Sequence, residues 1–216
     1  MSARGWPADL SDGPVRLRPL RRRDQRAWCD VRNRNLDWLM PWESTLPPEP
    51  MSGALVSVSS GSADGATYRG MLRSLRRQAR DGSTLPFAIE FNRRFVGQVT
   101  VSSIVRGSLQ SASVGYWLDQ GVAGQGVAPT AVALVVDHCF GPVGLHRVEL
   151  NVRPENVRSR RVAEKLGFRE EGIRLRYLHI DHGWRDHLCY ALTVEDVPGG
   201  LLRRYRRQVS QQHDQG

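Results

Sequence analysis

The chain has 216 residues, 40% apolar and 25% charged, with a formal net charge of +9, as expected for one basic globular domain with at most a small appendage. Its longest purely apolar run, 131–136, is far shorter than the roughly 20 residues of a membrane-spanning helix, so we expect none. The three cysteines form no CxxC pair, which argues against a disulfide framework and a zinc site and favours a location in the reducing cytoplasm. Residues 1–14 contain no apolar stretch, which argues against a secretion signal.

The first half of the chain begins with a strand and a helix. Residues 15–20 alternate apolar and basic side chains as a strand does, and 21–39 have the pattern of a helix with a loop at its end. The stretch 41–67 is rich in proline, glycine and serine, which predicts a loop. Apolar spacing then predicts a helix at 68–80, and alternating patterns predict strands at 85–91, 95–103 and 111–118.

The second half alternates strands and helices. A glycine-containing loop at 121–128 precedes a helix at 129–140, in which Pro129 suits the first helical position. The further predicted elements are a strand at 145–152, a helix at 156–166 and strands at 172–180 and 184–193.

This order predicts an α/β fold in the broad sense, a mixed (α+β) sheet with helices on its faces and one strand–helix–strand unit at its centre. We expect a single domain over 15–195. Residues 1–14 form an N-terminal extension, and 196–216 form a basic C-terminal tail that frays.

The loop before helix 129–140 suits an anion. Gly124 and Gly126 allow the backbone to turn with N–H groups facing one way. The start of the helix adds unpaired N–H groups and the positive end of the helix dipole, which together form a cradle for a pyrophosphate. The spacing matches neither GxGxxG nor GxxxxGK[ST], which disfavours a nicotinamide site and a P-loop. The alternative is that the glycines merely shape a tight loop.

Three segments together resemble the GNAT acetyltransferases, and within them the RimJ/RimL branch, which acetylates N-terminal amines of ribosomal proteins. The resemblance covers about 15–195 and is densest from 114 to 172. It implies a GNAT acyltransferase fold with splayed central strands, acetyl-CoA as the cofactor and no metal. The segments are GYWL (115–118) with AGQGVAPTA (123–131), HRVELNVRPEN (146–156) and SRRVAEKLGF (159–168).

The resemblance also places the cofactor. It implies that strand 114–118 pairs with the pantetheine arm and that backbone N–H groups of 124–128 hold the pyrophosphate. Ala123 stands where the superfamily often has Arg or Gln, so a side-chain contact is lost while the backbone cradle remains. The expected cofactor-binding residues are Tyr116, Trp117, Leu118, Gly124, Gln125, Gly126, Val127, Ala128, Thr130, Asn151, Asn156 and Ser159.

The catalytic residues usual in the family do not transfer to this chain. Attack of an amine on a thioester needs a base, an oxyanion donor and a proton for the leaving thiolate. Where other N-terminal acetyltransferases have a glutamate base and a tyrosine acid, this chain has Asn151 and Ala163. The glutamate of some RimL-like enzymes falls on Leu178.

Local patterning offers replacements for these groups. Glu149 lies on the polar face of strand 145–152 and is our candidate base, with an ion pair to Arg147 as the alternative role. Ser159 and Tyr177 are candidate proton donors. Ser159 is alternatively an ordinary residue of a helix surface.

A short aromatic segment is the candidate substrate-binding site. Trp38, Trp42 and Glu43 resemble the loop that covers the acceptor in the RimJ/RimL branch, where they would form a wall with a carboxylate that attracts an amine. The alternative is that the rings only anchor the loop. The histidines show no ligand spacing, so we predict no metal site.

These features predict an acetyl-CoA-dependent N-acetyltransferase whose acceptor is the N-terminal α-amine of a protein, such as a ribosomal protein, by direct attack on the thioester. The alternatives are an acetyltransferase for a small amine and a non-catalytic ribosome- or RNA-binding protein on the same fold. The net charge of +9 suits proximity to RNA, or it simply keeps the protein soluble. We expect no membrane partner and a monomer or homodimer.

Overall fold

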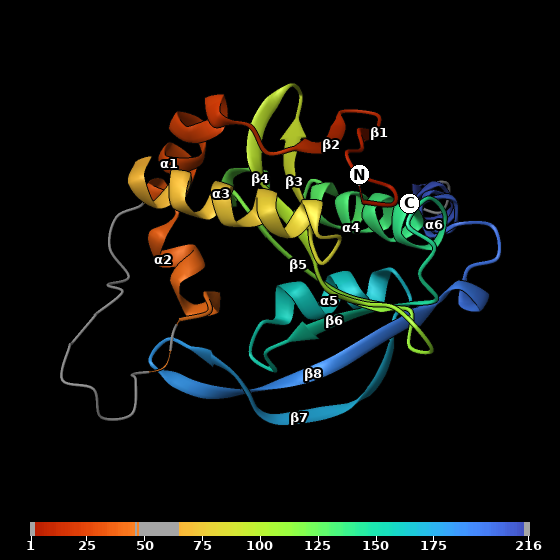
Figure 1. Cartoon of the computed structure of the whole chain (residues 1–216). Helices are drawn as coiled ribbons and strands as arrows, with labels where there is room; N and C mark the ends of the chain where they lie inside the picture. The colour runs from red at the N-terminus through yellow and green to blue at the C-terminus, as the bar shows by residue number, and fades with distance from the viewer. Residues whose placement is uncertain (1–2, 46, 48–64, 214–216) are drawn as a thin grey trace.

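The computed structural model describes residues 3–45, 47 and 65–213 as one eight-stranded sheet with helices on both faces (Figure 1). The strand order is β1-β2-β3-β4-β5-β6-β8-β7, and among these neighbours only β5 and β6 run parallel. The strands are β1 (Leu10–Asp12), β2 (Val15–Pro19), β3 (Leu85–Phe91), β4 (Arg94–Val105), β5 (Ser111–Leu118), β6 (Arg147–Val152), β7 (Arg169–Ile180) and β8 (Gly183–Thr193).

The helices form two layers. Side chains of α1 and α3 pack with Ala88 of β3 on one face of the sheet. Phe87 and Ile89, which alternate with Ala88, belong to the larger core that includes α4, α5 and α6. The bounds are α1 (Gln25–Arg34), α2 (Leu36–Leu39), α3 (Gly65–Arg80), α4 (Val127–Phe140), α5 (Val157–Lys165) and α6 (Leu201–His213), with short 3-10 helices η1 (Arg22–Asp24), η2 (Met40–Trp42), η3 (Gln120–Val122) and η4 (Val194–Asp196).

The mixed sheet with helices on its faces is confirmed, and β3 and β5 have the predicted bounds. The position of Pro129 was predicted wrongly: α4 begins at Val127, so Pro129 is its third residue. Its missing N–H still costs nothing there, because the first-turn N–H groups of a helix have no partner within the helix. Of the predicted loop 41–67, residues 46 and 48–64 lie outside the described part.

The fraying C-terminal tail was also predicted wrongly. From Leu201 the tail forms α6, which packs on α4 with Leu201 and Tyr205 buried. Asp137 of α4 accepts hydrogen bonds from the N–H groups of Leu201 and Leu202, at 2.6 and 3.1 Å, and so caps the start of α6. Part of the predicted N-terminal extension, β1, is likewise an edge strand of the sheet.

Strands β5 and β6 separate in the middle of the sheet. They pair only from Ser111 with Arg147 to Ser113 with Glu149. Beyond this point β5 continues to Leu118 with β4 as its neighbour, and β6 continues to Val152 with β8 as its neighbour. One edge of β5 is therefore unpaired over residues 114–118, which leaves backbone groups available to a ligand.

No helix among the described residues combines the length and the apolar character needed to cross a membrane.

Candidate functional site

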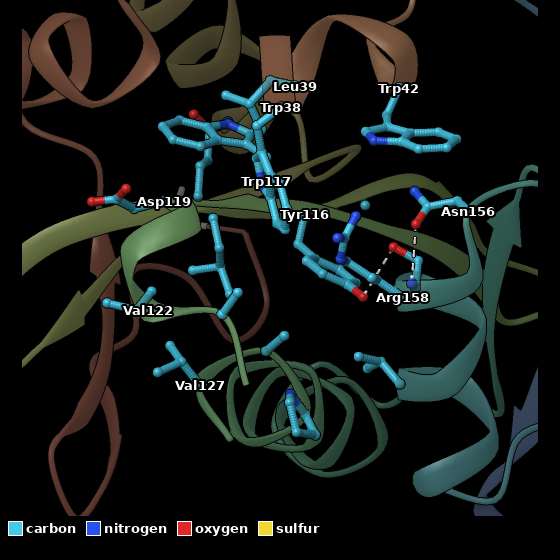
Figure 2. Close-up of a pocket in the computed structure, with 18 of the residues that line it drawn as sticks. Trp38, Leu39, Trp42, Tyr116, Trp117, Asp119, Val122, Val127, Asn156 and Arg158 are labelled. Atoms are coloured by element: carbon cyan, nitrogen blue, oxygen red, sulfur yellow. Dashed lines mark hydrogen bonds between the residues drawn. The ribbon is translucent and has the colours of Figure 1, made fainter. Parts of the chain in front are cut away.

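A cavity of about 730 Å³ lies beside the separated part of β5. This volume is in the range of ligand sites for small molecules and cofactors. Its walls come from α2 and η2, from β4 and β5, from the loop that ends at the start of α4, and from the first turns of α5 (Figure 2). Segments from both halves of the chain meet there.

The glycine loop reaches α4 through two left-handed residues. Gly124 and Gly126 have φ angles of 81° and 75°, which glycine adopts without strain, and Gly126 is the N-cap of α4. The first-turn N–H groups of Val127 and Ala128 have no partner within the helix, and both residues line the cavity. The loop thus presents donors and the positive end of a helix to the cavity, as an anion site requires.

Asp119 fixes the beginning of this loop. It accepts hydrogen bonds from Arg34, from Asn35 at 2.9 Å and from the N–H of Gly121 at 3.2 Å. Burial alone would raise the pKa of Asp119, but these hydrogen bonds outweigh it, so the pKa is lowered and the carboxylate stays charged. Asp119 lines the cavity, but its carboxylate is already hydrogen-bonded to Arg34 and Asn35 and so attaches the loop to the C-terminal end of α1.

The two aromatic residues of β5 point to opposite faces of the sheet. Trp117 packs against Trp28 of α1 and Phe95 of β4. Tyr116 points toward α5, where its hydroxyl donates a hydrogen bond to Oγ of Ser159 at 3.3 Å (Figure 2). Burial raises the pKa of Tyr116 to about 12, although the hydrogen bond to Ser159 opposes the shift. The phenol is therefore neutral at ordinary pH.

The start of α5 places Ser159 in the cavity wall. Asn156 is the N-cap of α5, and its side-chain oxygen accepts a hydrogen bond from the N–H of Ser159 at 3.1 Å. Both residues line the cavity. Asn156 therefore fixes the first turn, and with it the position of the Ser159 hydroxyl.

Three cations of α5 line the cavity as well, and sequence reasoning missed them. Arg158, Arg161 and Lys165 stand three and four residues apart, which puts them on one face of the helix. No ion pair joins Arg158, Arg161 or Lys165 to a carboxylate of the described residues. Their helical spacing directly after Asn156 is the sequence signal that could have identified this basic face of α5.

The predicted aromatic segment forms the opposite end of the cavity. The Arg158 guanidinium lies 4.3 Å from the ring centre of Trp38, and that of Arg153 lies 5.5 Å from the ring centre of Trp42. Arg153 also donates to the carbonyl of Pro41 at 2.8 Å. The two tryptophans therefore line the cavity and also anchor their segment to the α5 side.

Glu43 lies in the same wall and forms an ion pair with Arg32. Burial lowers the pKa of Arg32, whose guanidinium also stacks on Trp28 and Trp117, with its carbon 4.9 and 5.3 Å from their ring centres. The segment continues to Thr45, which is tied to β7 through His179: the Thr45 N–H donates to its carbonyl at 2.9 Å.

The structure does not bring the candidate base into the cavity. Glu149 lies outside the lining, and its two oxygens accept hydrogen bonds from Arg147 at 2.9 Å and Arg174 at 2.8 Å. Tyr177 is also outside, where its hydroxyl accepts from Arg174 at 3.1 Å and its ring packs on His187. Of the three candidate catalytic residues, only Ser159 lines the cavity.

Most of the expected cofactor-binding residues come together. The lining contains Tyr116, Trp117, Leu118, Gly124, Gly126, Val127, Ala128, Asn156 and Ser159. Three others point elsewhere. The Gln125 side chain donates to the carbonyl of Gly121 at 3.0 Å, and the Thr130 side chain bonds to Tyr205. Asn151 lies outside the lining, and its buried side-chain oxygen has no partner among the described residues.

The cavity thus has two chemically different ends. One has backbone donors, a helix start and the cations Arg161 and Lys165, which suit phosphates. The other has tryptophan rings and Glu43, which suit the apolar and cationic parts of an amine. In the described residues, no three His, Cys, Asp or Glu side chains are grouped as a metal site would require.

Comparison with known proteins gives concordant matches. A family model described as an acetyltransferase (GNAT) domain matches residues 15–169. The ribosomal protein uS5-alanine N-acetyltransferase of Escherichia coli is 31% identical over 181 residues, which cover 82% of this chain and 87% of that protein. The probable N-acetyltransferase YjcK of Bacillus subtilis is 44% identical over 103 residues, or 48% of this chain, and the match spans a little over half of that relative, 57%.

Solved structures agree with these sequence matches. Mycobacterium smegmatis RimJ in complex with CoA-disulfide is 40% identical, with a TM-score of 0.85 over 95% of this chain and 97% of that one. A ribosomal-protein-S5-alanine acetyltransferase from Vibrio fischeri is 26% identical, with a TM-score of 0.73 over 88% of this chain and 98% of that one.

Proposed function

The chain belongs to the GNAT acetyltransferase family, and we propose that it transfers the acetyl group of acetyl-CoA to the N-terminal α-amine of a protein, with ribosomal proteins as the acceptor class. The single observation that carries the proposal is the separation of β5 from β6 beside a cavity with a phosphate end and an aromatic end. The names of the relatives support the acceptor class. A cytoplasmic location fits such an acceptor.

The residues present fit acetyl-CoA. The free edge of β5 suits the amides of the pantetheine arm, and the N–H groups around Gly126 suit the pyrophosphate. Arg161 and Lys165 of α5 suit the remaining phosphate charge. When bound, acetyl-CoA supplies an acyl group activated as a thioester.

The residues of the cavity also supply the proton movements that the transfer needs. The N–C bond forms as the C–S bond breaks, so one proton must leave the amine and one must reach the sulfur. Glu43 is the carboxylate at the aromatic end and takes the amine proton, directly or through water. Ser159 donates to the departing sulfur, and Tyr116, hydrogen-bonded to Ser159, replaces that proton.

The charges of the aromatic end favour a peptide amine over a polyamine. A polycationic acceptor needs several carboxylates, whereas Glu43 here is accompanied by Arg32, Arg153 and Arg158. These arginines would repel a second and third positive charge. A peptide presents one ammonium group and a backbone that can lie along tryptophan rings.

The test is release of CoA from acetyl-CoA with a panel of acceptors. We expect saturable release with a peptide that begins with alanine or serine and none with the same peptide already N-acetylated. Faster release with spermidine or an amino acid would replace the proposed acceptor. Failure to bind acetyl-CoA, measured by calorimetry, would leave only the non-catalytic alternative.

A further inference from the structure

Helix α3 carries arginines without any acidic residue over its whole length. Of these, 69, 73, 76 and 80 repeat at helical spacing and form one exposed row about 16 Å long. The apolar side chains of the same helix, among them Leu72, face the core. The arginines of α3 are Arg69, Arg73, Arg76, Arg77 and Arg80.

The row forms one wall of a groove, which we call the α3 groove. It has a volume of about 370 Å³ and is lined by Arg22, Gln25, Arg69, Leu72, Arg73 and Arg76. The Arg69 side chain donates to the Gln25 side chain at 3.1 Å across it. Because Leu72 is buried at its base, the charged groups that the groove exposes are all guanidinium groups, beside the neutral side chain of Gln25.

The described residues do not neutralise the positive charge of the α3 groove. No carboxylate of the described residues pairs with its four arginines. The nearest in sequence, Asp24, is already engaged by Arg18 at 2.7 Å. By contrast, Arg147 binds both Glu149 and Glu171. Four guanidinium groups around one groove, with no carboxylate partner in the described part of the chain, therefore suit an anion from outside.

The α3 groove lies close to the aromatic end of the catalytic cavity. Gln25 lines the groove, and Arg32 lines the cavity. They are seven residues apart on α1, so they share one face of the helix and are separated by two turns, about 10 Å. Figure 1 shows α1 beside α3, with α2 continuing from α1.

We propose that the α3 groove binds the phosphodiester backbone of RNA. A row of guanidinium forks suits a chain of repeated phosphates. A membrane surface fits less well, since a helix that binds one exposes an apolar face, and the apolar face of α3 is buried in the core. The role of this contact rests on the proposed function: RNA in the groove would hold a ribosomal particle with a protein N-terminus near the cavity.

The test compares two double variants of the full-length protein. R73A/R76A removes two groove charges, and R203A/R207A removes two exposed arginines of α6 that are unpaired in the described part. Alanine favours a helix at least as well as arginine does, so both variants should fold. The readout is fluorescence anisotropy with a labelled single-stranded RNA of about 20 nucleotides at several salt concentrations.

We expect R73A/R76A to weaken RNA binding about tenfold at 0.1 M salt and to reduce the slope of log K against log salt by about 1.4, as loss of two phosphate contacts predicts. R203A/R207A should stay within about threefold of the parent protein. Equal losses in both variants, or tighter binding to polyglutamate or to anionic vesicles than to RNA, would overturn the proposal. Acetylation of a free peptide without RNA tests the proposed function separately, and R73A/R76A should leave that rate unchanged.

Discussion

The hydroxyl of Tyr116 donates a hydrogen bond to Oγ of Ser159 across the opening between β5 and α5. The two residues are 43 positions apart in the chain. The N-cap Asn156 holds the serine, and burial keeps the tyrosine neutral by raising its pKa to about 12. A hydroxyl pair of this kind can deliver a proton to a sulfur beside it.

Replacement of Ser159 by alanine should therefore lower kcat by about 10- to 100-fold with little change in the KM for acetyl-CoA, because the lost donor acts when the thiolate leaves. Tyr116→Phe should have a smaller effect, since Ser159 can still take its proton from water. Both follow from steady-state rates with an alanine-terminated peptide. A larger rise in the KM for acetyl-CoA than fall in kcat would mean that Ser159 serves binding only.

The positions of two carboxylates give opposite expectations for two matched variants. Glu43 lines the cavity, so Glu43→Gln should lower kcat/KM for the peptide about tenfold or more. Glu149 is outside the cavity and held by Arg147 and Arg174, so Glu149→Gln should keep kcat/KM within about threefold. The pH profile of each variant completes the test. The reverse pattern would return the role of base to Glu149.

The glycine loop can be tested against a turn of similar geometry. Gly124 and Gly107 have φ angles of 81° and 71°, and a Cβ at either would meet nothing within 4 Å. Alanine at each should thus cost a similar backbone strain, about 1–2 kcal/mol. Only Gly124→Ala should also weaken CoA binding, by about tenfold, because it displaces the N–H groups before α4. Calorimetric titration with CoA distinguishes the two variants.

The cavity was largely predictable where its chemistry lies in local patterns. The glycines before α4, Asn156 before α5 and the strand β5 each have a signal within a few residues. The surroundings of Glu149 were not predictable, because Arg174 comes from β7, which reaches β6 only through β8. The polar face of β6 was expected, but its partners depend on a register that no local pattern records.

The C-terminal helix shows how composition can mislead. Its many Arg and Gln residues suggested a frayed tail, yet Leu201, Tyr205 and Val209 recur every four residues and pack on the core. This spacing was present in the sequence. Strand β1 could not be predicted in this way, because its three residues are too few to show an alternating pattern and it is defined by its pairing with β2.

The contact between α4 and α6 predicts a stability change. Asp137 accepts the first two N–H groups of α6, so Asp137→Ala should lower the free energy of unfolding by about 1–2 kcal/mol, as loss of an N-cap does. Asp30→Ala, which removes an exposed carboxylate 3.9 Å from Arg26, should cost less than about 0.5 kcal/mol. Urea denaturation measures both. Equal effects would show that α6 does not depend on this cap.

Stability at alkaline pH should depend on Cys139, a fully buried thiol of α4. Burial raises its pKa from 9.0 to about 12, although Arg106 slightly opposes the shift. Between these two values the unfolded state has lost the proton and the native state has kept it, so stability is full below pH 9 and falls as pH rises, by at most about 1.4 kcal/mol per unit. The buried tyrosines, whose ordinary pKa is 10.0, contribute only above pH 10. The dependence of the urea midpoint on pH between pH 9 and 10 therefore reports on thiols. Cys139→Ala should make this dependence less steep. Burial also raises the pKa of the Cys189 thiol, so Cys189→Ala should remove a separate part of the same dependence. An unchanged slope in Cys139→Ala would show that the thiolate is accommodated in the core.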